Sequence, residues 1–394
     1  MNKEIIFIIN SMRGGGAERV ITLLCNAATK KGYNVSLILT YQSKKDAVFH
    51  AIDNRIDIIS LADEISNQKS SSLMPHLIML FARLIGKLGF ENKSSVFKYY
   101  SRNFDSVAWL KKHFKNHKNS SAVAFLYDSI FLTLLSKNKS TKVIISERGD
   151  PAQSSDSKTV AAFMKTEFPK ADGIVFQSPD AQKWYLENTP AKGTVIFNPI
   201  KTDLPEPYNG ERKKRIVNFC RISSQKNLIM LADAFAEFRE EFPEYELDII
   251  GDAVGNEVEG YLDSVNERIR YHHLENSIHI LPARSDIHDY IKDYAMFVSS
   301  SDYEGMSNSM LEAMAMGLPC VCTDCPAGGA RAVIKDGENG LLTPVGDAHA
   351  LSEAMKRIAK NPDLASKLSQ NSIKIREEQS VDKIIEKWME LING

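Results

Sequence analysis

The sequence predicts an α/β protein with two doubly wound parallel sheets, one after the other along the chain. Short apolar runs rich in β-branched residues alternate with longer segments of helical periodicity, the pattern of parallel sheets covered by helices. The alternation forms two series, separated by the proline- and glycine-rich segment "FNPIKTDLPEPYNGERKKR". A length of 394 residues also suits two domains. We place a first domain at residues 1–200, joined by the C-terminal helix 378–394, and a second domain at residues 201–377.

The expected elements follow from these runs. The predicted strands of the first series are Ile5–Asn10, Val35–Thr40, Val123–Leu126, Val143–Ser146 and Gly173–Gln177. Those of the second series are Ile216–Cys220, Glu246–Ile250, Ile278–Leu281, Met296–Ser299 and Cys320–Thr323. Helical periodicity is clear in Ala17–Lys31, Asn227–Glu241 and Ser307–Met316. Because doubly wound sheets bind ligands at the carboxyl ends of their strands, candidate functional residues are sought there.

Composition excludes some partners and favours others. The formal net charge of -1 gives no overall field for binding nucleic acid. The segment 65–120, however, holds ten Lys or Arg residues and two acids, a formal excess of +8. That excess suits an anionic partner or membrane surface. No apolar span is long enough to cross a bilayer, and the first apolar run is too short for a signal peptide, so we expect a cytoplasmic protein.

The stretch "SSSLMPHLIMLFARLIGKLGF" opens this basic segment and predicts an amphipathic helix. His76, Arg83 and Lys87 form one polar stripe on an otherwise apolar helix. A core helix would account for the apolar face, but less easily for the lysines that follow it. We therefore predict peripheral contact with an anionic membrane through residues 65–120, on the inner face of the cell membrane.

Five cysteines are present, and three of them form a C-x-C-x-x-C run at Cys320, Cys322 and Cys325. Such a run can bind a metal ion, but no histidine lies nearby at a useful spacing. We interpret these residues as reduced, mostly buried thiols and expect no metal ion.

The first strand ends in the glycine-rich stretch "NSMRGGGAERV". Gly14, Gly15 and Gly16 bring bare backbone to the start of a helix, where free N–H groups attract an anion. A dinucleotide fingerprint is not present, because Arg19 stands where the third glycine belongs. The second strand also ends at Thr40 without the acid that would bind a ribose, which disfavours NAD. A tight strand-to-helix turn without any ligand remains an alternative.

In the second series, "VNFCRISSQKN" places Arg221 directly after a strand and Lys226 at the mouth of the next helix. Two fixed cations beside a helix N-terminus can hold a diphosphate. Two solvated surface cations are the alternative. The next strand ends at Gly251, which again permits close approach to backbone.

Glu312 is the only charged residue between Gly305 and Thr323. No Lys or Arg lies within one helical turn, and a carboxylate among apolar residues is costly unless something hydrogen-bonds it. A ribose diol would do so, and a distant Lys or Arg of the fold is the alternative. Glu304 lies eight residues earlier, within ~12 Å along a helix axis and roughly 80° around it. Two such carboxylates could bind hydroxyl groups at opposite ends of a sugar nucleotide.

These features together resemble a known family, the retaining nucleotide-sugar-dependent glycosyltransferases of the GT-B fold, family four. The resemblance rests on the E-x7-E segment "EGMSNSMLE", the following "AMAMGLPCVCTDCPAGG", and "CRISSQKN", in which Cys220 occupies the place of a glycine. The stretches "GGGAERV" and "VIKDGENGLL" complete it. It covers most of the chain and implies two Rossmann-like domains facing a cleft.

The resemblance also implies roles for individual residues. Arg221 and Lys226 would bind the donor diphosphate and stabilise it as it leaves, and Glu304 would hold the transferred sugar. Further donor contacts are implied for Gly15, Gly16, Gly251, Arg284, Gly305, Met306, Ser307 and Glu312. Of these, Glu312 would hold the ribose and the backbone at Arg284 would meet the base. The family needs no divalent metal or other cofactor, since the nucleotide-sugar is a co-substrate.

The sequence departs from the family in its first domain. Many relatives carry a histidine after a strand there, whereas "VIISERGDP" has Arg148 at that place. Glu147, Arg148 or Asp150 could contribute instead, and we take Arg148 as the candidate catalytic residue. Retention is thought to proceed by front-face attack, in which the leaving phosphate helps to deprotonate the acceptor, so a protein base is not required.

The resemblance therefore implies a retaining glycosyltransferase that moves a hexose or N-acetylhexosamine from a donor, expected to be UDP-linked. A lipid-linked or surface-polysaccharide acceptor, as in bacterial cell-surface polysaccharide assembly, would fit the basic segment 65–120. Two alternatives remain open. The fold also hosts sugar-nucleotide 2-epimerases, which need no acceptor, and a non-catalytic nucleotide-sugar-binding module is possible.

Overall fold

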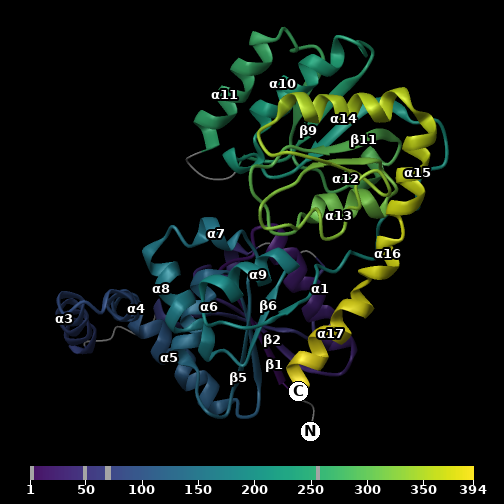
Figure 1. Cartoon of the computed structure of the whole chain (residues 1–394). Coiled ribbons are helices and arrows are strands. Elements are labelled where there is room, and N and C mark those ends of the chain that lie inside the picture. The colour runs from purple at the N-terminus through teal and green to yellow at the C-terminus, as the bar shows by residue number, and fades with distance from the viewer. Residues whose placement is uncertain (1–3, 48–50, 67–71, 254–257) are drawn as a thin grey trace. The chain divides into compact units, whose positions relative to one another are not determined.

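The computed structural model describes residues 4–47, 51–66, 72–253 and 258–394, which form two compact α/β units (Figure 1). Unit 1 consists of Met1–Pro199 together with Val381–Gly394, and unit 2 of Ile200–Ser380. Each unit contains one parallel sheet with helices against it, which confirms the predicted fold class. Lys69 of the predicted basic segment lies outside the described residues.

The sheet of unit 1 has seven parallel strands in the order β3-β2-β1-β4-β5-β6-β7. Their bounds are β1 Glu4–Ile9, β2 Asn34–Leu39, β3 Asp57–Ser60, β4 Ser121–Phe125, β5 Lys142–Ser146, β6 Gly173–Phe176 and β7 Thr194–Val195. Alternate residues of β1 enter two separate apolar cores, with Ile5 and Phe7 in one and Ile6 and Ile8 in the other. Both faces of the sheet are therefore buried, as expected for parallel strands.

The helices of unit 1 cover these two faces. They are α1 Gly16–Lys30, α2 Leu61–Ser66, α3 Met74–Lys87, α4 Glu91–Arg102, α5 Phe104–Asn116, α6 Tyr127–Ser136, α7 Pro151–Ser154, α8 Lys158–Thr166, α9 Pro179–Asn188 and α17 Val381–Asn393. The last of them, α17, packs beside α1, and its Trp388 stacks on Phe125 of β4 with ring centroids 5.8 Å apart. The C-terminal helix thus completes the core of the N-terminal unit.

The sheet of unit 2 has six parallel strands in the order β10-β9-β8-β11-β12-β13. Their bounds are β8 Lys213–Phe219, β9 Glu246–Ile250, β10 Ile278–Leu281, β11 Tyr294–Ser299, β12 Cys320–Thr323 and β13 Leu341–Thr343. The helices are α10 Leu228–Arg239, α11 Val258–Tyr271, α12 Ile287–Ile291, α13 Asn308–Ala315, α14 Ala348–Lys360, α15 Pro362–Ser372 and α16 Ile375–Glu378. None of the helices in the described parts of the chain is long and apolar enough to span a bilayer.

Strand order reverses at one place in each sheet, between β1 and β4 in unit 1 and between β8 and β11 in unit 2. Neighbouring connections leave in opposite directions at such a point, which opens a crevice at the carboxyl ends of the two strands. In unit 2 the segments that leave these strand ends are 220–227, after β8, and 300–307, after β11. We call them the switch-point loops.

Candidate functional site

The two switch-point loops of unit 2 are tied to one another by hydrogen bonds. The backbone N–H of Asp302 donates to the carbonyl of Gln225 at 3.0 Å, and Nε2 of Gln225 donates to the carbonyl of Tyr303 at 2.7 Å. Asn227 donates from Nδ2 to Oδ1 of Asp302 at 2.7 Å. Polar side chains that are far apart in the sequence are therefore held in a fixed relation at the reversal point.

Lys226 and Glu304 face each other across these loops. Nζ of Lys226 forms an ion pair with Oε1 of Glu304, and Oγ of Ser301 donates to the same oxygen at 3.2 Å. The two side chains are only 15% and 18% exposed. Burial lowers the pKa of Lys226, but attraction to Glu304 outweighs it and holds that pKa above its ordinary value. The pair is a fixed cation and a fixed anion in a partly dehydrated site.

Arg221 belongs to the same group. It follows β8 and is exposed, and its charge acts on the thiol of Cys220 together with the charges of Lys226 and Glu304. Burial dominates at that thiol and raises the pKa of Cys220 to about 12. Cys220 is therefore a neutral thiol near physiological pH, and the charge of the site comes from Arg221, Lys226 and Glu304.

Glu312 is not partnerless, contrary to the sequence-based expectation. Its Oε2 lies 2.8 Å from Nε2 of His288, which comes from α12, and both side chains are buried, at 4% and 8% exposed. The partner is a histidine, whereas the expected alternative to a ribose was a Lys or Arg of the fold. His288 lies 24 positions earlier in the sequence, so helical spacing could not reveal it. Glu312 therefore pairs with a residue of α12, whereas Glu304 pairs with Lys226 in the loop after β8.

Three predicted donor contacts, Gly305, Met306 and Ser307, lie at the start of α13. Ser307 is the N-cap of this helix, and its side chain accepts a hydrogen bond from the N–H of Met310 at 3.4 Å. Gly305 precedes it and is buried. A Cβ on Gly329 would lie 1.6 Å from the carbonyl oxygen of Gly305, so only glycine fits at position 329. The segment containing Gly329 thus packs directly on the loop that carries Glu304.

Gly251 and Arg284 lie further along the same sheet edge. A Cβ on Gly251 would come within 1.7 Å of the carbonyl oxygen of Cys220, so this glycine permits close packing of neighbouring backbone. The Arg284 guanidinium donates to Asp286 at 2.9 Å and stacks on the ring of Tyr290 at 3.8 Å. Neither residue belongs to the group around Lys226 and Glu304.

In unit 1 the glycine-rich loop binds a carboxylate from its own helix. The N–H groups of Arg13 and Gly15 each donate to Oε2 of Glu18 at 2.6 Å, and Oγ of Ser11 donates to Oε1 at 3.1 Å. Gly14 adopts a φ of +89°, which favours glycine. The Gly15 N–H is therefore occupied by Glu18 in this structure, and the predicted approach of Gly15 to the donor phosphates stays a prediction. Gly16, also predicted as a donor contact, begins α1.

Arg148 follows β5 and is held by neighbours on three sides. Its Nη2 donates to Oδ1 of Asn198 at 2.7 Å, its Nη1 to Oγ of Ser146 at 3.3 Å, and its guanidinium lies 4.7 Å from the ring centre of Phe125. Burial lowers the pKa of Arg148 to about 9, so the side chain stays a cation at neutral pH. A cation fixed in this way cannot act as a general base.

Glu147, beside Arg148, is buried and accepts four hydrogen bonds. Tyr127 and Tyr185 donate to its Oε2 at 2.6 and 2.7 Å, and the N–H groups of Arg148 and Gly149 donate to its Oε1 at 3.0 Å. Asp150, the third residue considered in this stretch, caps α7 by accepting from the N–H of Ala152 at 2.9 Å. Both acids therefore support the local fold around Arg148.

Sequence reasoning missed several of these groups. Asn227 carries a detectable signal, because it stands at a helix start, where its side chain accepts from the N–H of Met230 at 3.1 Å. Glu18 also carries one, as the third helical residue after a glycine cap. His288 and Asn198 carry none, since each meets its partner only through the tertiary fold.

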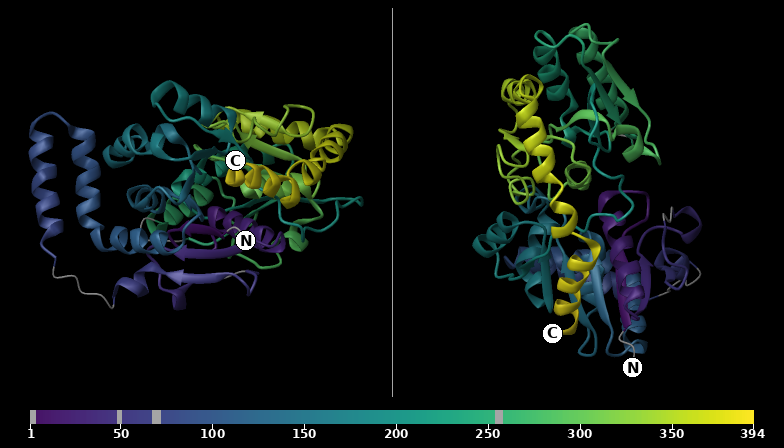
Figure 2. Two further views of the ribbon diagram at one scale, coloured as in Figure 1. Left: turned by 90° about the horizontal axis from the view of Figure 1, so that it is seen from below. Right: turned by 90° about the vertical axis from the view of Figure 1, so that its right-hand side faces the viewer.

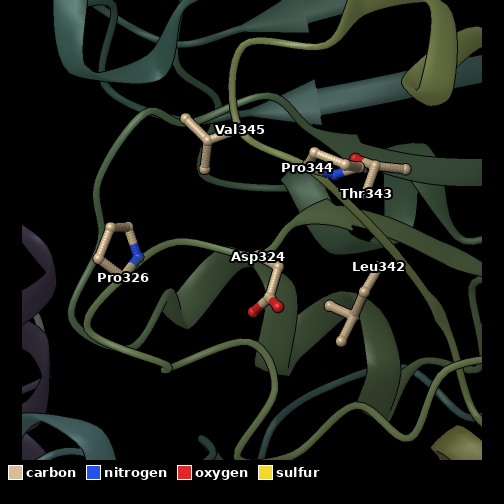
Figure 3. A pocket seen from close by; sticks show the side chains of 6 residues that line it. All are labelled: Asp324, Pro326, Leu342, Thr343, Pro344 and Val345. Carbon is tan, nitrogen blue, oxygen red and sulfur yellow. The ribbon is translucent and has the colours of Figure 1, made fainter.

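A separate, open pocket of about 490 Å³ lies at the carboxyl ends of β12 and β13 (Figure 3). It is lined by Asp324, Pro326, Leu342, Thr343, Pro344 and Val345. The Asp324 carboxylate accepts from Nε of Arg331 at 2.6 Å. This pocket holds none of the charged residues that the sequence singled out, and it lies away from the strand-order reversal. The switch-point loops therefore remain the candidate functional site.

Among the described residues, one group of three side chains has the spacing of metal ligands, and it lies on the surface of α10 and α14. There Glu237, His349 and Glu353 place their ligand atoms within 4.8 Å of one another, and the last two are exposed. The cysteines Cys320, Cys322 and Cys325 are buried, and burial raises the pKa of each thiol. Deprotonated thiolates, which a metal ion would need, are therefore disfavoured at these positions.

Comparison with known families gives a match within the second unit. Residues 201–375 match the family model described as glycosyl transferases group 1. Over 385 residues the chain is 25% identical to an N-acetylgalactosamine-N,N'-diacetylbacillosaminyl-diphospho-undecaprenol 4-alpha-N-acetylgalactosaminyltransferase of Campylobacter jejuni, with 95% of each chain covered.

Solved structures with the same fold include two that cover the whole chain. One is a point mutant of TarM from S. aureus, in complex with fondaparinux, alpha-GlcNAc-glycerol and UDP, at a TM-score of 0.79 and 15% identity. The other is Anabaena HepE in complex with UDP and glucose, at a TM-score of 0.78 and 17% identity. In both comparisons 100% of each chain is covered, and the GT-B fold is confirmed.

Proposed function

We propose that this protein is a retaining glycosyltransferase with a UDP-sugar donor and a lipid-linked or surface-polysaccharide acceptor, because residues 201–375 match the family model of the group 1 glycosyl transferases. The observation that carries this proposal is the partly buried Lys226–Glu304 ion pair at the β8/β11 reversal, with Arg221 beside it. A hexose or an N-acetylhexosamine would be the transferred group.

Arg221 and Lys226 have the charge and the position to bind a diphosphate. As the bond between the anomeric carbon and the donor phosphate breaks, negative charge grows on the departing phosphate. Cations that are already fixed in place stabilise that charge without reorganisation. Lys226 is fixed by Glu304, and the tie between the switch-point loops keeps both near the strand ends. These residues therefore supply the electrostatic part of catalysis.

Glu304 has a second role in the proposal. Its Oε2 is not the atom that pairs with Lys226, and an ionised carboxylate accepts hydrogen bonds only. It would receive hydroxyl groups of the transferred sugar and hold the anomeric carbon in register. The acceptor oxygen then attacks from the face that the phosphate leaves, and its proton passes to the departing phosphate. No protein base is required, in keeping with the cationic Arg148.

We also propose donor contacts for three residues of unit 1, as the family resemblance implies. Arg148 is presented as a rigid cation by Asn198 and Phe125, and we assign it to the donor sugar or its phosphate. Gly16 would contact the donor through its backbone. Gly15 has its N–H occupied by Glu18, so its proposed role is to let the chain pass close to the donor.

Names of similar proteins support the finer assignments. TarM and HepE were solved with UDP, which supports a uridine donor here. The Campylobacter relative is named for an undecaprenyl-diphosphate-linked substrate and an alpha linkage, which supports a lipid-linked acceptor and retention. A lipid-linked acceptor would place the protein peripherally at a membrane surface, and we propose the inner face of the cell membrane.

The test begins with the nucleotide. Calorimetric titration of UDP, GDP and ADP identifies the base, and we expect UDP to bind most tightly. UDP-sugars are then supplied with an undecaprenyl-diphosphate-linked oligosaccharide, and the product's anomeric configuration is read by NMR. Transfer with an alpha linkage supports the proposal. An altered free sugar without acceptor would identify a 2-epimerase, and tight nucleotide binding without turnover would identify a binding module.

No divalent metal enters the proposed chemistry, since Arg221 and Lys226 carry the positive charge that a metal would otherwise supply. We therefore expect the rate of transfer to change by less than about twofold after EDTA treatment and desalting, because fixed cations persist without an ion. Restoration of a lost rate by added Mg²⁺ or Mn²⁺ would contradict the assignment.

A further inference from the structure

Helix α3 exposes an unusual number of apolar side chains. Eight of the twelve large hydrophobic side chains that are exposed in the described residues lie on it or at its ends. They are Leu73, Met74, Leu77, Leu80, Phe81, Leu84, Leu88 and Phe90, each 48–75% exposed. Scattered exposed apolar residues are normal, but a contiguous set of this kind marks an interaction surface.

The helix is attached to unit 1 along one side only. Helices α3 and α4 form a hairpin that projects from unit 1 beyond α8, as two views show (Figures 1 and 2). Small residues bring the two helices close: Ala82 is fully buried, and a Cβ on Gly86 would lie 2.8 Å from Oγ of Ser94. Oγ of Ser94 also donates to the carbonyl of Ala82 at 2.8 Å. The face of α3 around Ala82 therefore packs against α4.

The exposed residues lie on another face. At 100° per residue, Leu73, Leu77, Leu80, Leu84 and Leu88 fall within an arc of about 80°, and Phe81 and Met74 widen it to about 120°. The centre of that arc is about 140° around the helix from Ala82. Packing on α4 therefore cannot cover it, and within the described structure it faces solvent. A helix that is apolar on both faces needs a second apolar environment.

The charges around this face point to one kind of environment. His76, Arg83 and Lys87 are exposed and form a stripe along one edge of the apolar arc. Lys93 follows on α4, where its ammonium group lies 5.6 Å from the ring centre of Phe90. Cations that border an apolar face are what an anionic bilayer binds, because the leucines enter the acyl region and the cations remain at the phosphates.

A second copy of the chain is less well matched. Pairing two α3 faces would bring two stripes of the same charge together. Between residues 72 and 120 the only acids are Glu91 and Asp105, against nine Lys or Arg residues, so a partner hairpin offers little to neutralise them. Like charges at an interface oppose association. The occupant that fits both the apolar arc and its cationic border is a membrane.

We propose that α3 is an interfacial membrane helix, with Leu77, Leu80, Leu84 and Leu88 among the acyl chains of an anionic bilayer and Arg83 and Lys87 at the lipid phosphates. This deepens the proposed function, because it supplies the surface on which a lipid-linked acceptor is met. Binding to vesicles requires neither donor nor turnover, so the two ideas fail separately.

The experiment measures co-sedimentation of the full chain with vesicles. One set contains phosphatidylglycerol and phosphatidylcholine in equal parts, and the other contains phosphatidylcholine alone. We expect binding to the anionic vesicles, weakened by salt, and much less binding to the neutral ones. The double variant Leu77→Ser/Leu84→Ser should bind at least ~10-fold more weakly, because two buried apolar side chains are lost.

Leu186→Ser is the matched control, since Leu186 is 53% exposed on α9 of the same unit, away from the hairpin. It should bind vesicles like the parent chain. Equal binding by the double variant, or no vesicle binding by the parent, would overturn the proposal. So would a lipid-free dimer that the double variant dissociates, because α3 would then serve a second copy. Vesicle binding without any sugar transfer would refute only the proposed function.

Discussion

Lys226 and Glu304 owe their position to the backbone around them. Each follows a strand at the β8/β11 reversal, and the bond between Asn227 and Asp302 ties their loops together. Asn227 adopts a φ of +42°, which asparagine tolerates better than most residues, and so turns the chain into α10. The charges are thus preorganised by neighbours that need not touch a substrate.

Replacing Lys226 tests this preorganised charge. Lys226→Ala should lower turnover by at least ~100-fold, the scale seen when one preorganised donor is removed. Arg221→Ala should have an effect of the same size. Lys214→Ala is a matched control, because Lys214 is exposed on β8 and pairs with Glu244 at the surface. Steady-state rates with saturating donor measure the effect, and near-parental turnover in the Lys226 variant would remove Lys226 from the mechanism.

The Glu312–His288 pair separates a structural role from a ligand contact. Glu312→Gln keeps a hydrogen-bonding side chain for His288, so the loss of unfolding free energy should stay near ~1 kcal/mol. If Glu312 also binds the ribose, UDP affinity should fall at least tenfold, since a charged hydrogen bond is lost. His288→Gln is the control for the pair itself. Equal UDP affinity in the Glu312 variant, measured by calorimetry, would leave Glu312 a purely structural residue.

At the scale of elements, periodicity and composition were sufficient to predict most strands of the two sheets. Strands β9, β10 and β12 have the predicted bounds, and α1, α10 and α13 agree to within two residues at each end. Strands β3, β7 and β13 were missed. Each lies at a sheet edge, is four residues or shorter, and gains its pairing from a neighbour that sequence alone does not reveal.

Helix α5 carries a histidine that links stability to pH. His113 stacks on Trp109 and His117 with ring centroids 4.8 and 4.2 Å apart, and burial, followed by repulsion from His117, lowers the pKa of His113 to about 4. In the unfolded chain the pKa of His113 is nearer its ordinary value of 6.5. Between these values the unfolded state binds more protons, so the unfolding free energy falls as the pH is lowered from about 6.5 to about 4.

His113→Phe keeps a ring in the stack and removes its titration. Urea unfolding at pH values across that window should give a shallower loss of stability than in the parent chain. His349→Phe is a useful control, because His349 is exposed on α14 of the other unit. A parental pH dependence in the His113 variant would show that other groups produce it.

For the whole molecule, the sequence predicted the positions of the candidate site residues better than it predicted their hydrogen-bond partners. Arg221, Lys226 and Glu304 were predicted to lie together because ligands bind at the strand ends of a parallel sheet, and the structure brings them together. The partners His288 and Glu18 were not found in advance. His288 and Glu18 form hydrogen bonds that were expected to go to ribose and phosphate, and only the folded chain brings these partners together.

The two units should also be distinguishable in unfolding. All three tryptophans, Trp109, Trp184 and Trp388, belong to unit 1, so their fluorescence reports that unit alone. Trp388→Ala removes a fully buried ring and should cost unit 1 about 3–5 kcal/mol. Calorimetry should show one transition moved to lower temperature while the other, from unit 2, stays. A parallel shift of both transitions would mean that the units unfold as one.

Helix α17 belongs to unit 1 but follows unit 2 in the sequence, which affects the order in which the two units can fold. A ribosome releases residues 1–199 first, yet the core around Phe125 lacks Trp388 until α17 has emerged. Domains are usually finished in the order of their synthesis. Here the later domain can mature while the earlier one waits, incomplete, for a helix that is translated after both sheets.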